Sequence, residues 1–462
     1  MEVVSRIIAF YNTWIGPYAL LVLLLPMGIL FTVLLKFIQI RKLGHAFAVV
    51  AGRYDDPNDE GDINHFQALS AALSATVGIG NIAGVALAIH LGGPGAVFWM
   101  WMTGLLGMTL KYAECSLALE YREIDDQGNV AGGPMYTMRK ALGAKYGRTA
   151  RVMALVFAAA VVICSFGTGN MAQSNSMADA LRSSYGVPTY LSGIGIALVV
   201  FVVIVGGIQR IGAVASKLVP FMAAFYILGA LTVIFANISR VPAAFHLILS
   251  DAFTGHAVGG GFLWTMIWGI RRGLFSNEAG QGSAPIAHAA AKTKWPAREG
   301  LVAMTEPFID TLLICTMTAL VVVLAGDYLH LAGASLTTQA FSAGLAPLGM
   351  SQGGRHIVTI GTVLFALSTA ISWSYYGDRA VEFLSGSSKL ITAYRVAFSF
   401  FLFVGAVWKL KLVWAFVDMV ITFMAIPNLI SLFLLRKEVV DLTRRYFSVR
   451  HKVYKKSALS PN

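Results

Sequence analysis

The sequence predicts an all-α integral membrane protein of about eleven transmembrane helices, with one additional N-terminal helix followed by two inverted halves of about five helices each. Three observations lead to this prediction. Of the 462 residues, 57% are hydrophobic and only 13% are charged, whereas a soluble domain carries about 25% charged residues. Apolar stretches long enough to cross a bilayer recur along the chain. Two of them contain glycine and asparagine at their middle, which weakens a helix.

Each apolar stretch is interpreted as a spanning helix, because backbone polar groups in hydrocarbon find partners only within a helix. The first apolar run, Ile15 to Leu35, is long for a signal peptide and lacks a small-residue cleavage site, so we expect it to be retained. The expected spans cover residues 16–38, 67–90, 95–119, 151–181, 189–206, 213–237, 260–290, 301–325, 355–383, 391–408 and 412–435.

The positions of lysine and arginine predict the orientation, because positive residues collect on the cytoplasmic side. With the N-terminus outside and the C-terminus in the cytoplasm, most of them fall inside, including Arg139, Lys140 and the tail that begins at Arg436. The chain is therefore expected in the cell inner membrane as a multi-pass protein. Although the net charge is +12, the basic tail is interpreted as this topological signal and as a contact with anionic membrane lipids, not as a nucleic-acid site.

The three cysteines, Cys115, Cys164 and Cys315, each fall inside an expected span. They show no CxxC spacing and no clustered histidine partners. The sequence therefore supports neither a disulfide framework nor a zinc site.

The two interrupted segments indicate an internal repeat. Residues 74–81 and 273–280 each interrupt a span, and the offset of about 199 residues between them also places residues 166–170 over 365–369. An odd number of spans in each half requires the halves to insert with opposite orientations. The expected parts are an N-terminal accessory helix and cytoplasmic loop (1–66), a first repeat (67–237), an extracellular connector (238–259), a second repeat (260–436) and a basic cytoplasmic tail (437–462). Two connections, 132–142 and 241–252, are expected to lie along the membrane surface.

An interrupted helix at mid-membrane offers free carbonyls at the end of its first half and free N–H groups at the start of its second half. We expect the carbonyls of Ser74, Thr76 and Val77 to face cations, and the N–H groups of Ile79 and Gly80 to face a carboxylate. The alternative is that the glycines only permit close helix packing.

Several polar side chains within spans are further candidates, because charges in a bilayer are costly and usually paired or functional. Arg271 and Arg272 suggest a gate or a salt bridge beside the second interruption. Glu278 suggests an ion ligand or proton carrier, or else pairing at a helix end. Glu114, beside Lys111 and Tyr112, is interpreted as part of a surface pair. The remaining charges, interpreted as mostly structural, are Glu306, Asp310, Asp378 and Asp418.

Six long motifs resemble the alanine or glycine:cation symporter family over nearly the whole chain. They occupy residues 74–89, 92–115, 132–138, 167–178, 272–293 and 368–384. The resemblance implies a leucine-transporter-like fold and Na⁺-coupled, sometimes H⁺-coupled, uptake of alanine, glycine or a similar small amino acid. It also implies two Na⁺ sites. One Na⁺ would bind at Thr76 and Asn81. The second would bind between the carbonyls of Ser74 and Val77 and the residues Phe365, Ser368 and Thr369 of the ninth span.

The candidate residues follow from the interruptions and the resemblance together. The amino acid is expected to place its carboxylate near Ile79 and Gly80, its ammonium near carbonyls around Thr76 and Phe275, and its side chain under Trp373 and Met171. The candidate substrate-binding residues are Thr76, Gly78, Ile79, Gly80, Gln173, Phe275, Ser276 and Trp373. The candidate ion ligands are Ser74, Thr76, Val77, Asn81, Phe365, Ser368 and Thr369.

Two residues depart from the family pattern. Ile79 stands where the family often has threonine, and Gln281 stands where it often has leucine. If Gln281 reaches the substrate, a more polar amino acid such as serine or glutamine becomes conceivable. The expected protein works as a monomer, and Na⁺ is the expected coupling ion with H⁺ as the alternative.

Three other classes are less consistent with the sequence. A channel needs a continuous pore, usually from oligomeric symmetry rather than an inverted internal repeat. An enzyme needs a catalytic motif, and neither HExxH nor a P-loop string is present. A receptor or sensor built on a transporter scaffold stays open as an alternative, although we expect no soluble signalling domain in this sequence.

Overall fold

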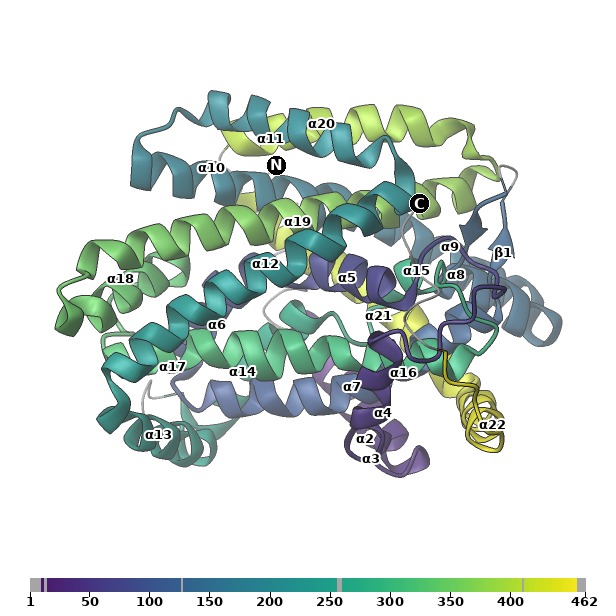
Figure 1. Ribbon diagram of the computed structural model, residues 1–462, viewed down its shortest axis with the longest axis horizontal. Coiled ribbons are helices and arrows are strands. Elements are labelled where there is room, and N and C mark those ends of the chain that lie inside the picture. The colour runs from purple at the N-terminus through teal and green to yellow at the C-terminus, as the bar shows by residue number, and fades with distance from the viewer. Residues whose placement is uncertain (1–9, 12–14, 126–127, 256–259, 409–410, 455–462) are drawn as a thin grey trace.

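The computed structural model describes residues 10–11, 15–125, 128–255, 260–408 and 411–454. Most long helices run between two ends of the molecule (Figure 1). At the right of Figure 1 lie the short hairpin β1 (Glu123–Ile124) and β2 (Val130–Ala131), with α8 (Pro134–Thr137), α15 (Ala284–His288) and α22 (Arg436–Phe447). We call this the hairpin end. At the left lie α13 (Val241–Thr254) and α18 (Gly333–Leu345), and we call this the α18 end.

The first half begins with a helix that is broken. α5 (His65–Thr76) starts at a capping box, in which the Asn64 side chain accepts from the Gln67 N–H and the Gln67 side chain accepts from the Asn64 N–H. It is followed by the π-helical segment η1 (Gly80–Gly84) and by α6 (Val85–Gly92), and the two parts of the span meet at an angle of 53°. The remaining helices of this half are α7 (Ala96–Glu120), α9 (Gly143–Phe166) with η3 (Gly167–Met171) and α10 (Ala172–Tyr185), α11 (Thr189–Ile204) and α12 (Gly207–Ala236).

The second half repeats this order of elements. It begins with α14 (Gly261–Asn277), which a turn separates from α15. The helices that follow are α16 (Pro296–Pro307) with η6 (Phe308–Cys315) and α17 (Thr316–Ala325), α18, α19 (Ser351–Ser385), α20 (Ile391–Val407) and α21 (Lys411–Leu434). Helix α9 packs against α21, and α19, which takes the place of α9 in this half, packs against α12. These matched contacts are what an inverted repeat requires.

Helices or runs of consecutive helices lie at each of the eleven expected spans, the first being α2 (Gly16–Leu34). By length and composition, five helices of the described residues can cross a membrane, and up to seven if each of two bent pairs is counted as one span. The two connections expected at the membrane surface also form helices, namely α8 with η2 (Met138–Leu142) and α13. The tail expected from residue 437 contains the amphipathic helix α22.

One boundary differs from the expectation. The interruption of the seventh span was expected at residues 273–280, but α14 remains helical to Asn277, and the chain turns at Glu278, whose φ is +52°. Phe275 and Ser276 therefore lie in the last turn of a helix. Glycine weakens a helix, but α14 continues through Gly273 to Asn277. Gly273 lies close to Thr103 of α7.

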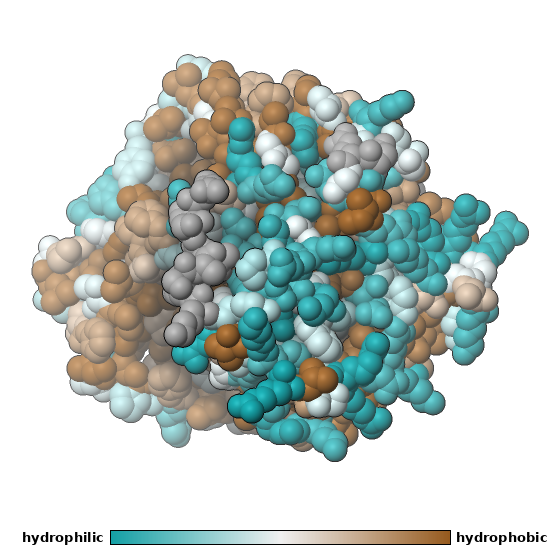
Figure 2. All heavy atoms as spheres, turned by 45° about the vertical axis from the view of Figure 1, so that its right-hand side comes forward, coloured by the Kyte–Doolittle hydropathy of each residue, from teal (hydrophilic) through white to brown (hydrophobic). Residues whose placement is uncertain are grey.

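The outer surface is consistent with a bilayer as solvent. Large apolar side chains are exposed on the flanks of α11, α12 and α20, among them Leu198, Leu228 and Phe400 at 61%, 64% and 61% exposure. Figure 2 shows hydrophilic residues gathered over the hairpin end, with hydrophobic residues along the flank beside it. The hydrophobic flank matches the lipid-facing surface of a membrane protein.

Candidate functional site

The break in the first broken helix lies against α19 and α14. The Gly78 N–H donates to Asn81 Oδ1 at 2.9 Å, and the Asn81 N–H donates to the Gly78 carbonyl at 3.2 Å, which closes the turn between α5 and η1. A Cβ on Gly78 would lie 2.7 Å from Thr369 Oγ1, and one on Gly80 would lie 3.2 Å from the Phe275 ring. The glycines therefore permit close helix packing, as the alternative interpretation required, and this packing is what brings the broken helix to α19 and α14.

Five oxygen atoms converge beside this break. Ser368 Oγ donates to the Ser74 carbonyl at 3.2 Å and lies 2.8 Å from the Phe365 carbonyl. Thr369 Oγ1 lies 3.0 Å from the Phe365 carbonyl and 3.4 Å from the Val77 carbonyl. All five residues are buried. We call these atoms the five-oxygen cluster: the carbonyls of Ser74, Val77 and Phe365 with the hydroxyls of Ser368 and Thr369.

The five-oxygen cluster fits a hard cation such as Na⁺. Oxygen ligands suit hard cations, and neutral carbonyl and hydroxyl oxygens suit a monovalent one. Ser74 Oγ also donates to the Ser368 carbonyl at 2.8 Å, so α5 and α19 are joined in both directions at this point. The cluster is complete only while the broken helix and α19 stay in contact.

The two residues expected at the other ion site have different partners. Thr76 Oγ1 bonds back to the Ala72 and Leu73 carbonyls of its own helix. The Asn81 amide instead donates to Asp310 Oδ1 at 2.6 Å and to Ser276 Oγ at 3.1 Å. A shared ion site at Thr76 and Asn81 stays a prediction, and the Thr76 hydroxyl is not directed at it.

Asp310 is a buried residue at the break whose contacts the sequence did not reveal. It is fully buried in η6, and it accepts from Asn81, from Ser276 Oγ at 2.8 Å and from Thr311 Oγ1 at 2.7 Å. It therefore connects both broken helices at the level of the break. The available signal was a carboxylate inside a span, which we interpreted as mostly structural.

Of the candidate substrate residues, Gln173 lies beside the break, whereas Trp373 lies beside Gly169. Gln173 donates to the Thr168 carbonyl at 3.0 Å, and its Oε1, which has no partner among the described residues, would lie 3.5 Å from a Cβ on Gly78. Trp373 is 1% exposed and lies close to Gly169, where an added Cβ would come within 2.3 Å of the Trp373 side chain. The π-helical η3 places Gly169 there, and such segments are frequent at functional sites.

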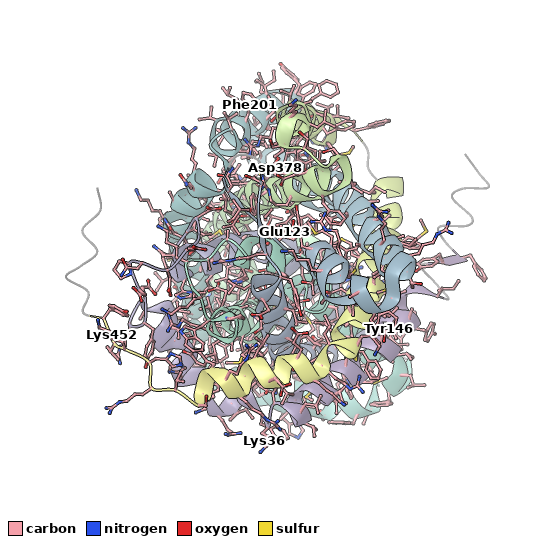
Figure 3. All side chains as sticks on the ribbon, turned by 90° about the vertical axis from the view of Figure 1, so that its right-hand side faces the viewer. Lys36, Glu123, Tyr146, Phe201, Asp378 and Lys452 are labelled. Atoms are coloured by element: carbon pink, nitrogen blue, oxygen red, sulfur yellow. The ribbon has the colours of Figure 1, made fainter. Side chains whose placement is uncertain are left out.

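A cavity of about 440 Å³ reaches the break from the α18 end. Ile79 and Ile82 form its inner part, and residues of α10, α18 and α19 form its walls. At the hairpin end, Arg379 Nη1 and Asp125 Oδ2 form an ion pair at 2.9 Å, with side chains 5% and 2% exposed. Figure 3 looks onto this end, where the neighbouring Glu123 and Asp378 lie near the middle of the molecule.

One interpretation of the charged residues needs correction, and the possible substrate contact of Gln281 stays a prediction. Lys111 and Glu114 do not form a surface pair, because both are buried and Lys111 Nζ donates to Glu306 Oε1 at 2.8 Å. Gln281 Nε2 donates to the Leu274 carbonyl at 2.8 Å, so it closes the end of α14. Glu278 accepts from Ser283 in the turn after α14, and its expected pairing with a neighbouring arginine or lysine stays a prediction.

The gate suggested at Arg271 and Arg272 stays a prediction. Both guanidinium groups lie over the Trp268 ring, at 5.3 and 5.6 Å from its centroid. Arg272 also lies 5.8 Å from the centroid of the Phe275 ring, next to the break.

Comparisons with known proteins give consistent results. The model of the family described as "Sodium:alanine symporter family" matches residues 1–460. The sodium/alanine symporter AgcS of Methanococcus maripaludis is 48% identical over 456 residues, which cover 97% of this chain and 98% of that protein. The probable sodium/glutamine symporter GlnT of Bacillus subtilis is 36% identical over 467 residues, covering 99% and 95%. Among solved structures, MhsT in complex with L-phenylalanine superimposes with a TM-score of 0.52 at 12% identity, covering 82% of this chain and 99% of that one. The last match shows a leucine-transporter-like fold.

Proposed function

Because the chain belongs to the sodium:alanine symporter family, a family of membrane transporters and not of enzymes, we propose that it couples inward Na⁺ flux to the uptake of a small neutral amino acid. Alanine or glycine is the proposed cargo, carried by alternating access. The observation that carries this proposal is the five-oxygen cluster at the break of α5, next to the glycines where the amino acid would bind.

The proposed pose of the amino acid follows the geometry of the break. Its carboxylate meets the N–H groups of Ile79 and Gly80, where the positive end of a helix begins and no side chain of Gly80 obstructs approach. Its ammonium meets the carbonyls around Thr76 and Phe275 and the unpartnered Gln173 Oε1. Its short side chain lies under Trp373 and Met171, which are both buried.

The proposed orientation in the cell inner membrane places the hairpin end in the cytoplasm. Lys140, Arg139 and the basic helix α22 all lie at this end, as the distribution of positive charge in membrane proteins requires. The N-terminus is then outside and the C-terminus inside. In this orientation the cavity at the α18 end would open to the outside, which supports the proposal of an outward-facing state, and the carrier is proposed to work as a monomer.

A more polar cargo is supported by one relative, the probable sodium/glutamine symporter. The residue that suggested such a cargo, Gln281, donates to the Leu274 carbonyl at 2.8 Å and so has a structural partner. We therefore retain alanine or glycine as the proposed cargo, with H⁺ as the alternative coupling ion.

Uptake of radiolabelled alanine into proteoliposomes tests the function, with Na⁺ and pH gradients imposed separately. We expect accumulation that follows the Na⁺ gradient. No response to any small amino acid would overturn the proposal.

The five-oxygen cluster has its own test in the double variant Ser368→Ala with Thr369→Ala. Loss of two of the five ligands should raise the Na⁺ concentration for half-maximal uptake by about tenfold or more, equivalent to about 1.4 kcal/mol. The matched control is Thr232→Ala with Ser399→Ala, two hydroxyls that bond only their own helices. Unchanged Na⁺ dependence in the Ser368 and Thr369 variant would exclude the cluster as the ion site.

A further inference from the structure

A row of buried acids and histidines runs from the hairpin-end surface toward the middle of the molecule. We call it the acid–histidine chain, and its members in order are Asp55, His65, Glu299, His288 and Glu306. The last four are 0% exposed, whereas the Asp55 side chain is 18% exposed in the loop beside the hairpin (Figure 1). Buried ionisable groups in a membrane protein are costly, and neither Na⁺ nor amino-acid binding uses these.

Each histidine of the chain lies between two carboxylates. His288 Nδ1 lies 2.5 Å from Glu299 Oε1, and its Nε2 lies 3.7 Å from Glu306 Oε2. His65 Nδ1 bonds to Glu299 Oε2, and its Nε2 lies 3.8 Å from Asp55 Oδ1. An imidazole with one carboxylate at each nitrogen can accept a proton on one side and release one on the other.

The two longer contacts are places where a proton can cross after a small shift. One contact joins His288 Nε2 and Glu306 Oε2, and the other joins His65 Nε2 and Asp55 Oδ1. None of these four atoms has a hydrogen-bond partner among the described residues. A contact of this length is closed by a small side-chain movement or by one bridging water. The arrangement is not a metal site, because the described residues contain no group of histidine, cysteine and acid side chains suited to a metal ion.

The chain is assembled from three helices with different roles. Glu299 and Glu306 lie seven residues apart on α16, hence on one face and about two turns from each other. His65 begins α5, and His288 ends α15, so each broken helix contributes one histidine. Movement of either broken helix would therefore bring the members of the acid–histidine chain together or separate them.

The inner end of the chain lies beside the break of α14. Glu306 Oε1 accepts from Lys111 Nζ at 2.8 Å, and Lys111 is also attracted to Glu278, which forms the turn after α14. At the outer end, burial raises the pKa of the Asp55 carboxyl, so it holds a proton more readily than an exposed aspartate. The other titratable or charged groups that face the chain are Asp59, Arg122, Arg298, Glu114, Cys115, Asp310 and Tyr376.

We propose that the acid–histidine chain is a path of proton exchange between the hairpin-end surface and the Lys111–Glu306 pair, so that the transport cycle includes a proton step. A proton on Asp55 Oδ1 passes to His65 Nε2, while His65 releases the proton on Nδ1 to Glu299. The Glu299 carboxyl turns and passes the proton to His288 Nδ1, and His288 releases its Nε2 proton to Glu306 Oε2. Asp55 loses one proton, Glu306 gains one, and the reverse sequence restores both.

The test uses right-side-out membrane vesicles that contain the full-length protein, and it rests on the proposed transport function. The initial rate of Na⁺-driven alanine uptake is measured with external pH and membrane potential held constant and the lumen at about pH 6 or about pH 8. One proton linked to the slow step changes the rate by up to about tenfold per pH unit, and we expect a change of about tenfold in all. A rate that does not depend on lumen pH would overturn the proposal even without variants.

Variants identify the path. His65→Gln and His288→Gln should each lose most of the dependence on lumen pH while they keep Na⁺-dependent uptake, because a merely structural histidine would not link rate to pH on one side only. The matched control is His330→Gln at the α18 end, where the side chain is 82% exposed, and it should keep the wild-type dependence. Wild-type dependence in both path variants would contradict the proposal. Absence of Na⁺-driven uptake in the wild type would instead contradict the proposed function.

Discussion

The same pair of broken helices runs toward both ends of the molecule, but the surroundings of the two helices differ between the ends. At the α18 end, a cavity of about 440 Å³ reaches Ile79, and its walls are largely small and hydroxyl side chains. At the hairpin end, Arg379 bonds to Asp125 and lies 2.9 Å from Glu382, and Arg122 donates to the Ala289 and Ala291 carbonyls. The α18 end therefore holds a cavity that reaches the break, whereas buried and paired charges lie across the hairpin end.

This difference shows where the free energy of alternating access lies. Opening the hairpin end would separate paired, buried charges, whereas closing the α18 end would fill the cavity there. The proposed sites for the amino acid and Na⁺ lie between the two ends, so binding there would link the two movements by holding α5 against α19. The following variants test this comparison.

The largest effect is expected for Arg379→Ala. Removal of one partner from a buried ion pair typically costs about 3–5 kcal/mol, because the other charge remains buried. The Asp125 carboxylate would then be buried without the Arg379 charge beside it. The hairpin end should therefore open, and uptake should fall by about a hundredfold. Labelling of a cysteine placed at Thr392, on the wall of the neighbouring cavity, should become faster.

The control for this variant is Arg182→Ala, which removes a surface pair with Asp179 whose side chains are 64% and 66% exposed. Such pairs contribute about 0–1 kcal/mol. If Arg379→Ala left both the uptake rate and the Thr392 labelling unchanged, the ion pair would not be what closes the hairpin end.

A smaller but specific effect is expected for Gly78→Ala. The new Cβ would lie 2.7 Å from Thr369 Oγ1, so the Thr369 hydroxyl or the break itself would have to shift. Overpacking of this kind costs about 1–3 kcal/mol and would separate the oxygens of the five-oxygen cluster. The Na⁺ concentration for half-maximal uptake should rise by about tenfold or more.

Gly84→Ala is the matched control in the same span. Nothing lies within 4 Å of its added Cβ, and Gly84 has helical dihedral angles of −68° and −41°. Alanine there should be neutral or slightly stabilising. Equal Na⁺ dependence in the two variants would show that the close approach of the break to α19 is not needed for ion binding.

Filling the open end should affect entry without loss of stability. Ala83 lines the cavity, and Ala83→Trp would occupy part of its volume. We expect the KM for alanine to rise by about tenfold, a loss of about 1.4 kcal/mol, while the melting temperature stays near that of the wild type. Leu228→Trp, at a position that is 64% exposed on the outer flank, serves as the control for added bulk. An unchanged KM in Ala83→Trp would mean that the cavity is not the entry route.

The smallest effect is expected for Gln281→Leu. The hydrogen bond to the Leu274 carbonyl would be lost at a cost of about 1 kcal/mol, seen as a lower melting temperature. The order of preference among alanine, glycine, serine and glutamine should not change, because the side chain is held at the end of α14. A shift of preference toward smaller or less polar amino acids would place Gln281 in the binding pocket after all.

The sequence by itself determined the class of the protein, the order of its helices and the first break. Apolar runs of bilayer length, the placement of Lys and Arg and the glycines at Gly78 and Gly80 are local properties, so they can be recognised without contacts. The cluster of Ser74, Val77, Phe365, Ser368 and Thr369 was also recoverable, since the repeat and the family resemblance placed those segments together.

Only the tertiary structure decided the environment of the buried charges. The local sequences around Lys111, Asp310 and Glu306 fit a surface pair or a structural charge equally well. Lys111 and Glu306 are 195 residues apart in the sequence, and Asp310 and its partner Asn81 are 229 residues apart. The same holds for the start of the second break at Glu278 and for the partner of Gln281. A helix sequence fixes which face a side chain occupies, but the neighbour that the side chain meets there is set by how distant helices pack.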